Sequence, residues 1–133
     1  MVWRSRVRLL LDTHVLIWRK ADSPKLPRII FNAISGAEDV YVSVATAWEI
    51  AIKVGIGKLP EAAELVANFE AAVWEEGFRV LPLTVPHVRL AGLMPSPHRD
   101  PFDRLLAAQA VIEGLMLVSS DAKMAGLGAD VIW

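Results

Sequence analysis

The pattern of apolar and polar positions along the chain predicts short strands that alternate with helices. Compact apolar runs that stop at a charged or turn residue are typical of strands buried on both faces of a sheet. The first such run ends at Asp12, and Asp121 follows the fourth run by two residues. The predicted strands cover residues 7–11, 40–42, 78–83, 115–119 and 130–133.

Longer segments with apolar residues at helical spacing predict the helices between these strands. The clearest covers residues 61–76, whose glutamates lie opposite Leu65 and Phe69. Asp100 followed by Pro101 is the usual start of a helix, a capping side chain and then proline at the first helical position. The predicted helices cover residues 13–20, 25–35, 44–54, 61–76, 85–93 and 101–113.

This alternation of strands and helices predicts one α/β domain over residues 1–133. Crossover helices join parallel strands and cover both faces of their sheet. We therefore expect a central, mostly parallel sheet of four to five strands between layers of helices. The composition agrees, since 54% of the 133 residues are hydrophobic and the mean hydropathy is +0.40, enough to bury a core.

Charge and cysteine content exclude several classes of protein. The chain has 14 Lys and Arg against 15 Asp and Glu, a net charge of −1, which excludes a nucleic-acid binder that works through bulk positive charge. It has no cysteine, which excludes disulfide scaffolds, thiolate zinc sites and thiol catalysis. No uncharged stretch approaches the roughly 20 apolar residues of a membrane helix or a secretory signal of roughly 7–15. We expect a cytoplasmic protein without a membrane segment.

Four acidic residues stand where a parallel sheet brings side chains together. The carboxyl ends of the strands and the first turns of the crossover helices share one edge, where ligand sites form. Asp12 and Asp121 follow two of the strands, and Asp103 lies in the first turn of a predicted helix. Glu49 lies about 9 Å into its helix, and its side chain leans back toward the same edge.

Each of these acids also has a purely structural interpretation. Asp12 and Asp121 are placed to cap helices, and Asp103 is placed to favour a helix dipole. Glu49 lies in a segment that is apolar on nearly every face, so we expect its helix to be buried all round. A buried carboxylate is costly unless it is compensated, and Lys53, four residues on, is placed to pair with it.

The alternative to these separate explanations is a shared cation. Three or four carboxylates without a cysteine or histidine cluster fit a hard ion, Mg²⁺ or Mn²⁺. Without that ion, mutual repulsion would raise the pKa of some of the carboxyls. The chemistry that such sites most often serve is hydrolysis at phosphorus. The three histidines, His14, His87 and His98, do not predict a ligand set of their own.

Four segments in order resemble the motifs of PIN-domain ribonucleases and, more narrowly, of VapC-type toxins from toxin–antitoxin pairs. The likeness runs from about residue 8 to residue 133 and therefore covers nearly the whole chain. The segments are 9–16 (LLLDTHVL), 43–53 (SVATAWEIAIK) with 57–59 (GKL) after it, 98–110 (HRDPFDRLLAAQA) and 117–121 (LVSSD).

The resemblance implies a three-layer α/β/α sandwich and a metal-dependent endoribonuclease that uses Mg²⁺ or Mn²⁺. It also implies a homodimer and a cognate VapB-like antitoxin that blocks the acidic site. The competing interpretation is a catalytically inactive PIN-like module that binds RNA or protein. The carboxylates that map to the catalytic and metal site are Asp12, Glu49, Asp103 and Asp121.

Further residues are expected around this site. Thr13 and Ser119 match the small hydroxyl residues beside the carboxylates, and His14 either lines the pocket or makes a structural hydrogen bond. Asp100 is either a member of the site or only a helix cap. The candidate contacts to RNA phosphates are Lys53, Lys58, Arg99 and Arg104. The tryptophans at helical positions, Trp18, Trp48 and Trp74, are expected in the core.

Overall fold

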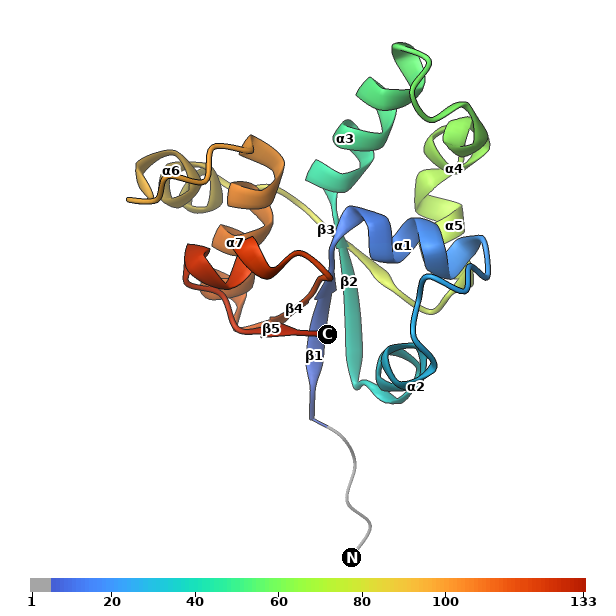
Figure 1. Cartoon of the computed structure of the whole chain (residues 1–133), viewed down its shortest axis with the longest axis horizontal. Coiled ribbons are helices and arrows are strands. Elements are labelled where there is room, and N and C mark those ends of the chain that lie inside the picture. Colours follow the sequence, from blue (N-terminus) through green and yellow to red (C-terminus); the bar gives the residue numbers. More distant parts are fainter. Residues whose placement is uncertain (1–5) are drawn as a thin grey trace, which may run out of the picture.

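The computed structural model describes residues 6–133 and has one five-stranded sheet at its centre (Figure 1). The strand order is β3-β2-β1-β4-β5, and each of the four strand pairings is parallel. The predicted α/β class and the predicted sheet are therefore confirmed. The strands are β1 (Arg8–Leu11), β2 (Asp39–Ser43), β3 (Arg79–Leu81), β4 (Met116–Val118) and β5 (Val131–Ile132).

The sheet has its topological switch point beside β1. The chain runs from β1 outward to β2 and β3, and then returns to place β4 on the other side of β1. Leu10 of β1 pairs with Tyr41 on one side and with Leu117 on the other. Ligands of parallel α/β sheets bind at the carboxyl ends of the strands at such a point.

Helices lie on both faces of the sheet and make a three-layer sandwich (Figure 1). Side chains alternate across a strand, so Leu9 and Leu11 pack among α1, α2 and α5, whereas Leu10 packs among α6, α7 and η2. The helices are α1 (Thr13–Lys20), α2 (Arg28–Gly36), α3 (Val44–Gly55), α4 (Ala63–Ala67), α5 (Phe69–Glu75), α6 (Val85–Leu93) and α7 (Pro101–Glu113), with 3₁₀ turns η1 (Pro60–Ala62) and η2 (Ala122–Leu127).

The prediction of one helix over residues 61–76 is wrong. The chain makes the turn η1 and then two short helices, α4 and α5, which meet at Asn68 with φ −121° and ψ 38°. The two helices pack against different elements, α4 against α3 and α5 against β3, so a straight helix would lose one of these contacts. Leu65 and Phe69 still face the same core.

The helix that carries Glu49 is not buried all round, contrary to expectation. Along α3, Val44, Trp48, Ile52 and Ile56 form an exposed apolar stripe at the spacing of successive helical turns. Trp48 is 55% exposed and its ring meets the ring of Phe102 edge-on, with the centroids 5.1 Å apart. The sequence pattern could not distinguish this surface stripe from a buried one, because both are apolar.

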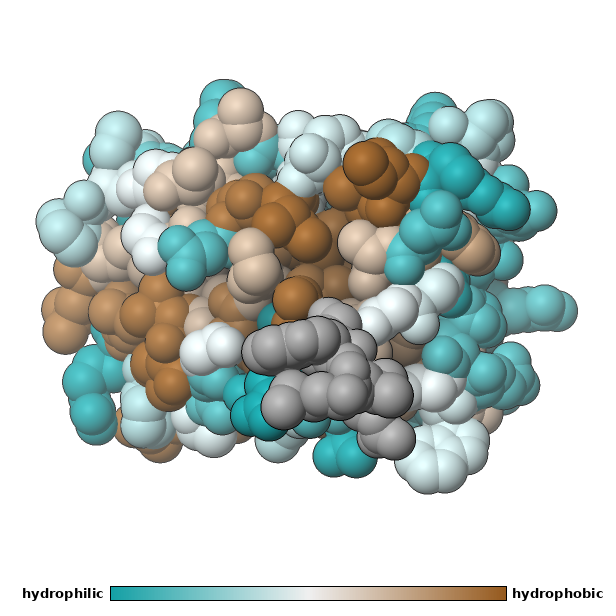
Figure 2. Space-filling view, turned by 90° about the horizontal axis from the view of Figure 1, so that it is seen from below, coloured by the Kyte–Doolittle hydropathy of each residue, from teal (hydrophilic) through white to brown (hydrophobic). Residues whose placement is uncertain are grey.

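Other apolar side chains also reach the surface. Trp74 is 78% exposed and Trp48 is 55% exposed, so their predicted places in the core are wrong, whereas Trp18 packs against the core as predicted. Figure 2 shows apolar residues gathered over the middle and left of the face seen from below. Every helix within residues 6–133 falls short of the length and hydropathy that a membrane-spanning helix requires.

Candidate active site

Asp12 lies at the centre of the edge formed by the carboxyl ends of the strands. It follows β1 and caps α1, with its Oδ1 accepting a hydrogen bond from the Thr13 amide at 2.6 Å. Its Oδ2 accepts the hydroxyl of Ser119, which follows β4, also at 2.6 Å. Burial raises the pKa of Asp12, and these two hydrogen bonds oppose the rise.

Glu49 projects from α3 to the same edge and is joined to Asp12 through Thr13. The Thr13 hydroxyl donates to Glu49 Oε1 at 2.7 Å and lies 3.2 Å from the hydroxyl of Thr46. The second oxygen, Oε2, accepts a hydrogen bond from Lys53 Nζ at 2.9 Å. The expected pair with Lys53 is therefore present, and it uses one of the two oxygens.

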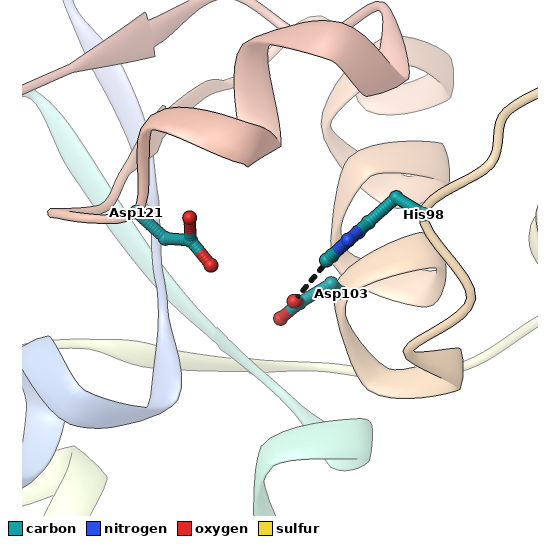
Figure 3. Close-up of side chains that lie close together, drawn as sticks. All are labelled: His98, Asp103 and Asp121. Atoms are coloured by element: carbon teal, nitrogen blue, oxygen red, sulfur yellow. Dashed lines mark hydrogen bonds and ion pairs between the residues drawn. The ribbon is translucent and has the colours of Figure 1, made fainter.

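Asp103 and Asp121 face each other across the same edge, with His98 beside them (Figure 3). His98 Nε2 lies 2.7 Å from Asp103 Oδ2, and Asp121 Oδ1 accepts the amide of Lys123 at 2.9 Å. One ligand atom from each of His98, Asp103 and Asp121 lies within 4.8 Å of the other two. These three side chains come from the loop before α7, from α7 and from the start of η2.

The charges of these acids act on one another. Burial raises the pKa of Asp103 to about 6; the hydrogen bond from His98 opposes the rise, and the nearby charges of Asp100 and Asp12 add to it. The charge of Glu49 likewise contributes to the raised pKa of Asp12. A raised pKa means that the charged form of the carboxylate is disfavoured. A bound cation would stabilise that charged form.

Known proteins share the sequence pattern of this chain. The sequence model of the PIN domain matches residues 9–129. The chain belongs to the PIN-domain family. It is 28% identical over 127 residues to Ribonuclease VapC22 of Mycobacterium tuberculosis, an alignment that covers 87% of this chain and 88% of the relative.

Solved structures share the fold of this PIN domain. VapBC2 from Rickettsia felis, bound to a DNA fragment from its promoter, matches with a TM-score of 0.70 and 13% identity over 95% of this chain and 98% of the other. FitAcB from Neisseria gonorrhoeae matches with a TM-score of 0.69 and 20% identity over 94% and 96% of the two chains.

The hydroxyl residues expected in the PIN domain touch the acids directly. Thr13 bonds to Glu49, and Ser119 bonds to Asp12 and also accepts the amide of Asp121 at 3.1 Å. Asp100 is exposed and caps α7, where its Oδ1 accepts two amides of the first turn at 2.9 and 3.1 Å. His14 is exposed, with its ring 5.9 Å from that of Trp18.

The four basic residues considered for RNA contacts differ in their surroundings. Arg104 points inward and donates to the backbone carbonyls of Ala91, Ser96, His98 and Met94, so its guanidinium holds a loop rather than facing solvent. Lys53 forms an ion pair with Glu49. Lys58 and Arg99 are exposed and stay candidates for phosphate contacts.

Thr46 lies beside these acids although the sequence did not point to it, whereas His98, which opens the motif of residues 98–110, lies beside Asp103. Thr46 lies three residues before Glu49 on the same helix face, a spacing that was available as a signal. His98 precedes Asp103 by five residues but stands in a loop between prolines, where no periodicity indicates direction. Its place beside the carboxylates depends on how the loop folds against α7.

Proposed function

We propose that this PIN domain is a metal-dependent endoribonuclease of the VapC type, the toxin of a toxin–antitoxin pair. The observation that carries the proposal is that Asp12, Glu49, Asp103 and Asp121 all lie at the carboxyl edge of the sheet. Ligand atoms of Asp103 and Asp121 lie within 4.8 Å of each other there, and burial raises the pKa of both Asp12 and Asp103. Membership of the PIN family and the likeness to a relative named as a ribonuclease support it. The reaction is hydrolysis of an RNA phosphodiester bond.

The donor set of this edge fits Mg²⁺ or Mn²⁺. It consists of carboxylate oxygens, and the chain has no cysteine to favour a softer ion. The residues that would hold the ion are Asp12, Asp103 and Asp121, with Glu49 completing the cluster. When bound, the ion activates water and stabilises the charge that develops on the phosphate.

The remaining side chains fix the carboxylates and guide the substrate. Ser119 and the Thr13 amide hold Asp12 in one orientation, and the Thr13 hydroxyl together with Lys53 does the same for Glu49. Because these carboxylates are already oriented, the protein does not have to rearrange them during the reaction. The exposed Lys58 and Arg99 flank the acidic motifs and are proposed to contact RNA phosphates.

We also propose that the chain works in the cytoplasm with a VapB-like antitoxin and as a homodimer. The structural relatives include complexes named VapBC and FitAcB. The exposed apolar stripe of α3 is surface of the kind that protein partners cover. Light scattering of the purified chain, alone and with the product of the neighbouring gene, tests both associations.

Cleavage of RNA by the purified chain tests the function. A labelled RNA is incubated with the protein in EDTA and then after addition of Mg²⁺ or Mn²⁺, with Asp12→Asn as the matched variant. We expect cutting with the ion in the natural chain and none in EDTA or in the folded variant. Cutting by Asp12→Asn at the parent rate would contradict the mechanism, and RNA binding without any cutting would indicate an inactive module.

A further inference from the structure

His98 is the member of the acidic edge that the proposed function leaves without a role. Its ring points toward Asp103 and Asp121 (Figure 3), and a ligand atom of each of the three lies within 4.8 Å of the others. Opposite ligands of an octahedral ion lie about 4.2 Å apart, twice a bond of about 2.1 Å. The separations of the three ligand atoms are therefore close to those that one ion requires.

Arg104 holds the loop that carries His98. Its Nη1 donates to the carbonyl oxygen of His98 at 2.9 Å and to that of Ser96 at 3.3 Å, while its other nitrogens bond to two further carbonyls of the segment. The His98 amide donates in turn to Ser96 Oγ at 3.2 Å. Because Arg104 directly follows Asp103 on α7, the loop is tied to the turn that carries the carboxylate, and the ring is placed before any ion binds.

The ring nitrogen that faces Asp103 is able to become a ligand. When Asp103 is ionised, its carboxylate can only accept, so Nε2 is the donor in this hydrogen bond. Within residues 6–133, Nδ1 of His98 has no hydrogen-bond partner, and the side chain is 19% exposed. The proton can therefore reside on Nδ1, in contact with water, which leaves the lone pair of Nε2 for a cation.

We propose that His98 is a nitrogen ligand of the ion at this edge and that it makes the site prefer Mn²⁺ to Mg²⁺. The proposal rests on the proposed function, because it needs the carboxylates to hold an ion. Mg²⁺ keeps to oxygen ligands, whereas an imidazole nitrogen suits first-row transition ions. Loss of the nitrogen weakens Mn²⁺ binding by roughly 10-fold or more and Mg²⁺ binding by no more than about threefold.

Pulsed electron paramagnetic resonance of the whole chain loaded with Mn²⁺ tests this assignment, since it detects nitrogen nuclei bonded to the ion. The natural chain is expected to show coupling to an imidazole nitrogen, and His98→Asn is expected to lose it. His14→Asn is the matched control, because it removes the histidine next to Asp12 and should keep the coupling. Calorimetric titrations with Mn²⁺ and Mg²⁺ measure the affinity ratio, which falls only in His98→Asn.

The outcomes separate this proposal from the proposed function. Mn²⁺ that binds without nitrogen coupling, or with coupling that survives in His98→Asn, overturns the role of His98 and leaves the carboxylate site standing. A chain that binds neither ion overturns both proposals. If His98→Asn does not fold, coupling retained in His14→Asn and His87→Gln assigns the nitrogen to His98, because the chain has three histidines. Loss of the coupling in either of these variants overturns the assignment.

Discussion

Asp12 and Glu49 form the first half of the acidic edge, and hydrogen bonds from the protein itself reach all of their carboxylate oxygens. Each of the four carboxylate oxygens accepts a hydrogen bond, from the Thr13 amide and hydroxyl, from Ser119 and from Lys53. The donors come from α1, α3 and the residue after β4, so the positions of these two acids follow from the assembly of the sheet and its helices.

Asp103 and Asp121 form the second half of the acidic edge, and within residues 6–133 the protein's own groups bond to only some of their carboxylate oxygens. Within the described part of the chain, one oxygen of each bonds to a protein donor or ring, Asp103 to His98 and Asp121 to the Lys123 amide. The pKa of Asp103 rises to about 6 because burial outweighs the hydrogen bond from His98.

The two halves therefore differ in how much a bound cation would add to their contacts. Folding fixes the first half, and its hydrogen bonds keep Asp12 and Glu49 in one orientation. Within residues 6–133 the second half keeps carboxylate oxygens free, so a bound cation would gain most of its new contacts there.

Asp103→Asn should reduce RNA cleavage by roughly 10²-fold or more, because it removes a charged ligand from the second half. Initial rates with saturating Mn²⁺ measure the loss. Asp100→Asn is the matched control three residues earlier, since asparagine caps a helix as well as aspartate does. Its rate should stay within about threefold of the natural chain, and an equal loss in both variants would make Asp100 a member of the site.

Ser119→Ala should lower the free energy of unfolding by about 1–3 kcal/mol, because it leaves a buried Asp12 oxygen without its donor. Denaturant titration measures the change. The neighbouring Ser120 is exposed, so Ser120→Ala should change stability by no more than about 0.5 kcal/mol. Equal stability of the two variants would show that the first half is not held by its hydrogen bonds.

Lower pH should stabilise the metal-free protein through Asp103. The folded chain holds this proton more tightly than the unfolded chain does, since the pKa rises from 3.8 to about 6. The stabilisation is therefore fully present below about pH 4 and is lost as the pH rises through 6. After allowance for solvent screening we expect about 1 kcal/mol.

Unfolding free energies in EDTA at several pH values, for the natural chain and Asp103→Asn, measure this contribution as a difference. The gap between the two proteins should shift in favour of the natural chain as the pH falls from 7 to 4. A gap that does not change with pH would contradict the assignment of the raised pKa to Asp103.

Lys53→Met should have the smallest effect, because the Lys53 side chain is 34% exposed and its pair with Glu49 is open to water. We expect a loss of about 0.5 kcal/mol in unfolding free energy. Thermal or denaturant unfolding measures it, and a loss of several kcal/mol would mean that Lys53, rather than Thr13, holds Glu49 in place.

The sequence predicts the first half of this site better than the second. Asp12 directly follows a buried strand and Glu49 lies on a capped helix, so parallel-sheet topology alone brings both to the edge. The approach of Asp103 and Asp121 also follows from strand and helix ends. The contribution of His98 does not, because it depends on the bonds of Arg104 to loop carbonyls, which leave no periodic trace in the sequence.

Two helical segments show a similar limit, because their sequence patterns predict a helix but not the elements that pack against it. The stripe along α3 and the segment 61–76 are apolar or amphipathic at helical spacing, yet one faces solvent and the other breaks at Asn68. In both places the outcome depends on which neighbouring elements pack against the helix. Hydrophobic periodicity describes the helix and does not identify its neighbours.

If both halves bind the same cation, a substitution in either half weakens the binding, and calorimetric titration of three proteins with Mn²⁺ measures this. The natural chain is compared with Asp12→Asn and Asp103→Asn, one substitution in each half. We predict that each substitution weakens binding by roughly 10-fold or more. Undiminished binding by folded Asp12→Asn would show that the ion belongs to the second half alone and would contradict a cation shared by the two halves.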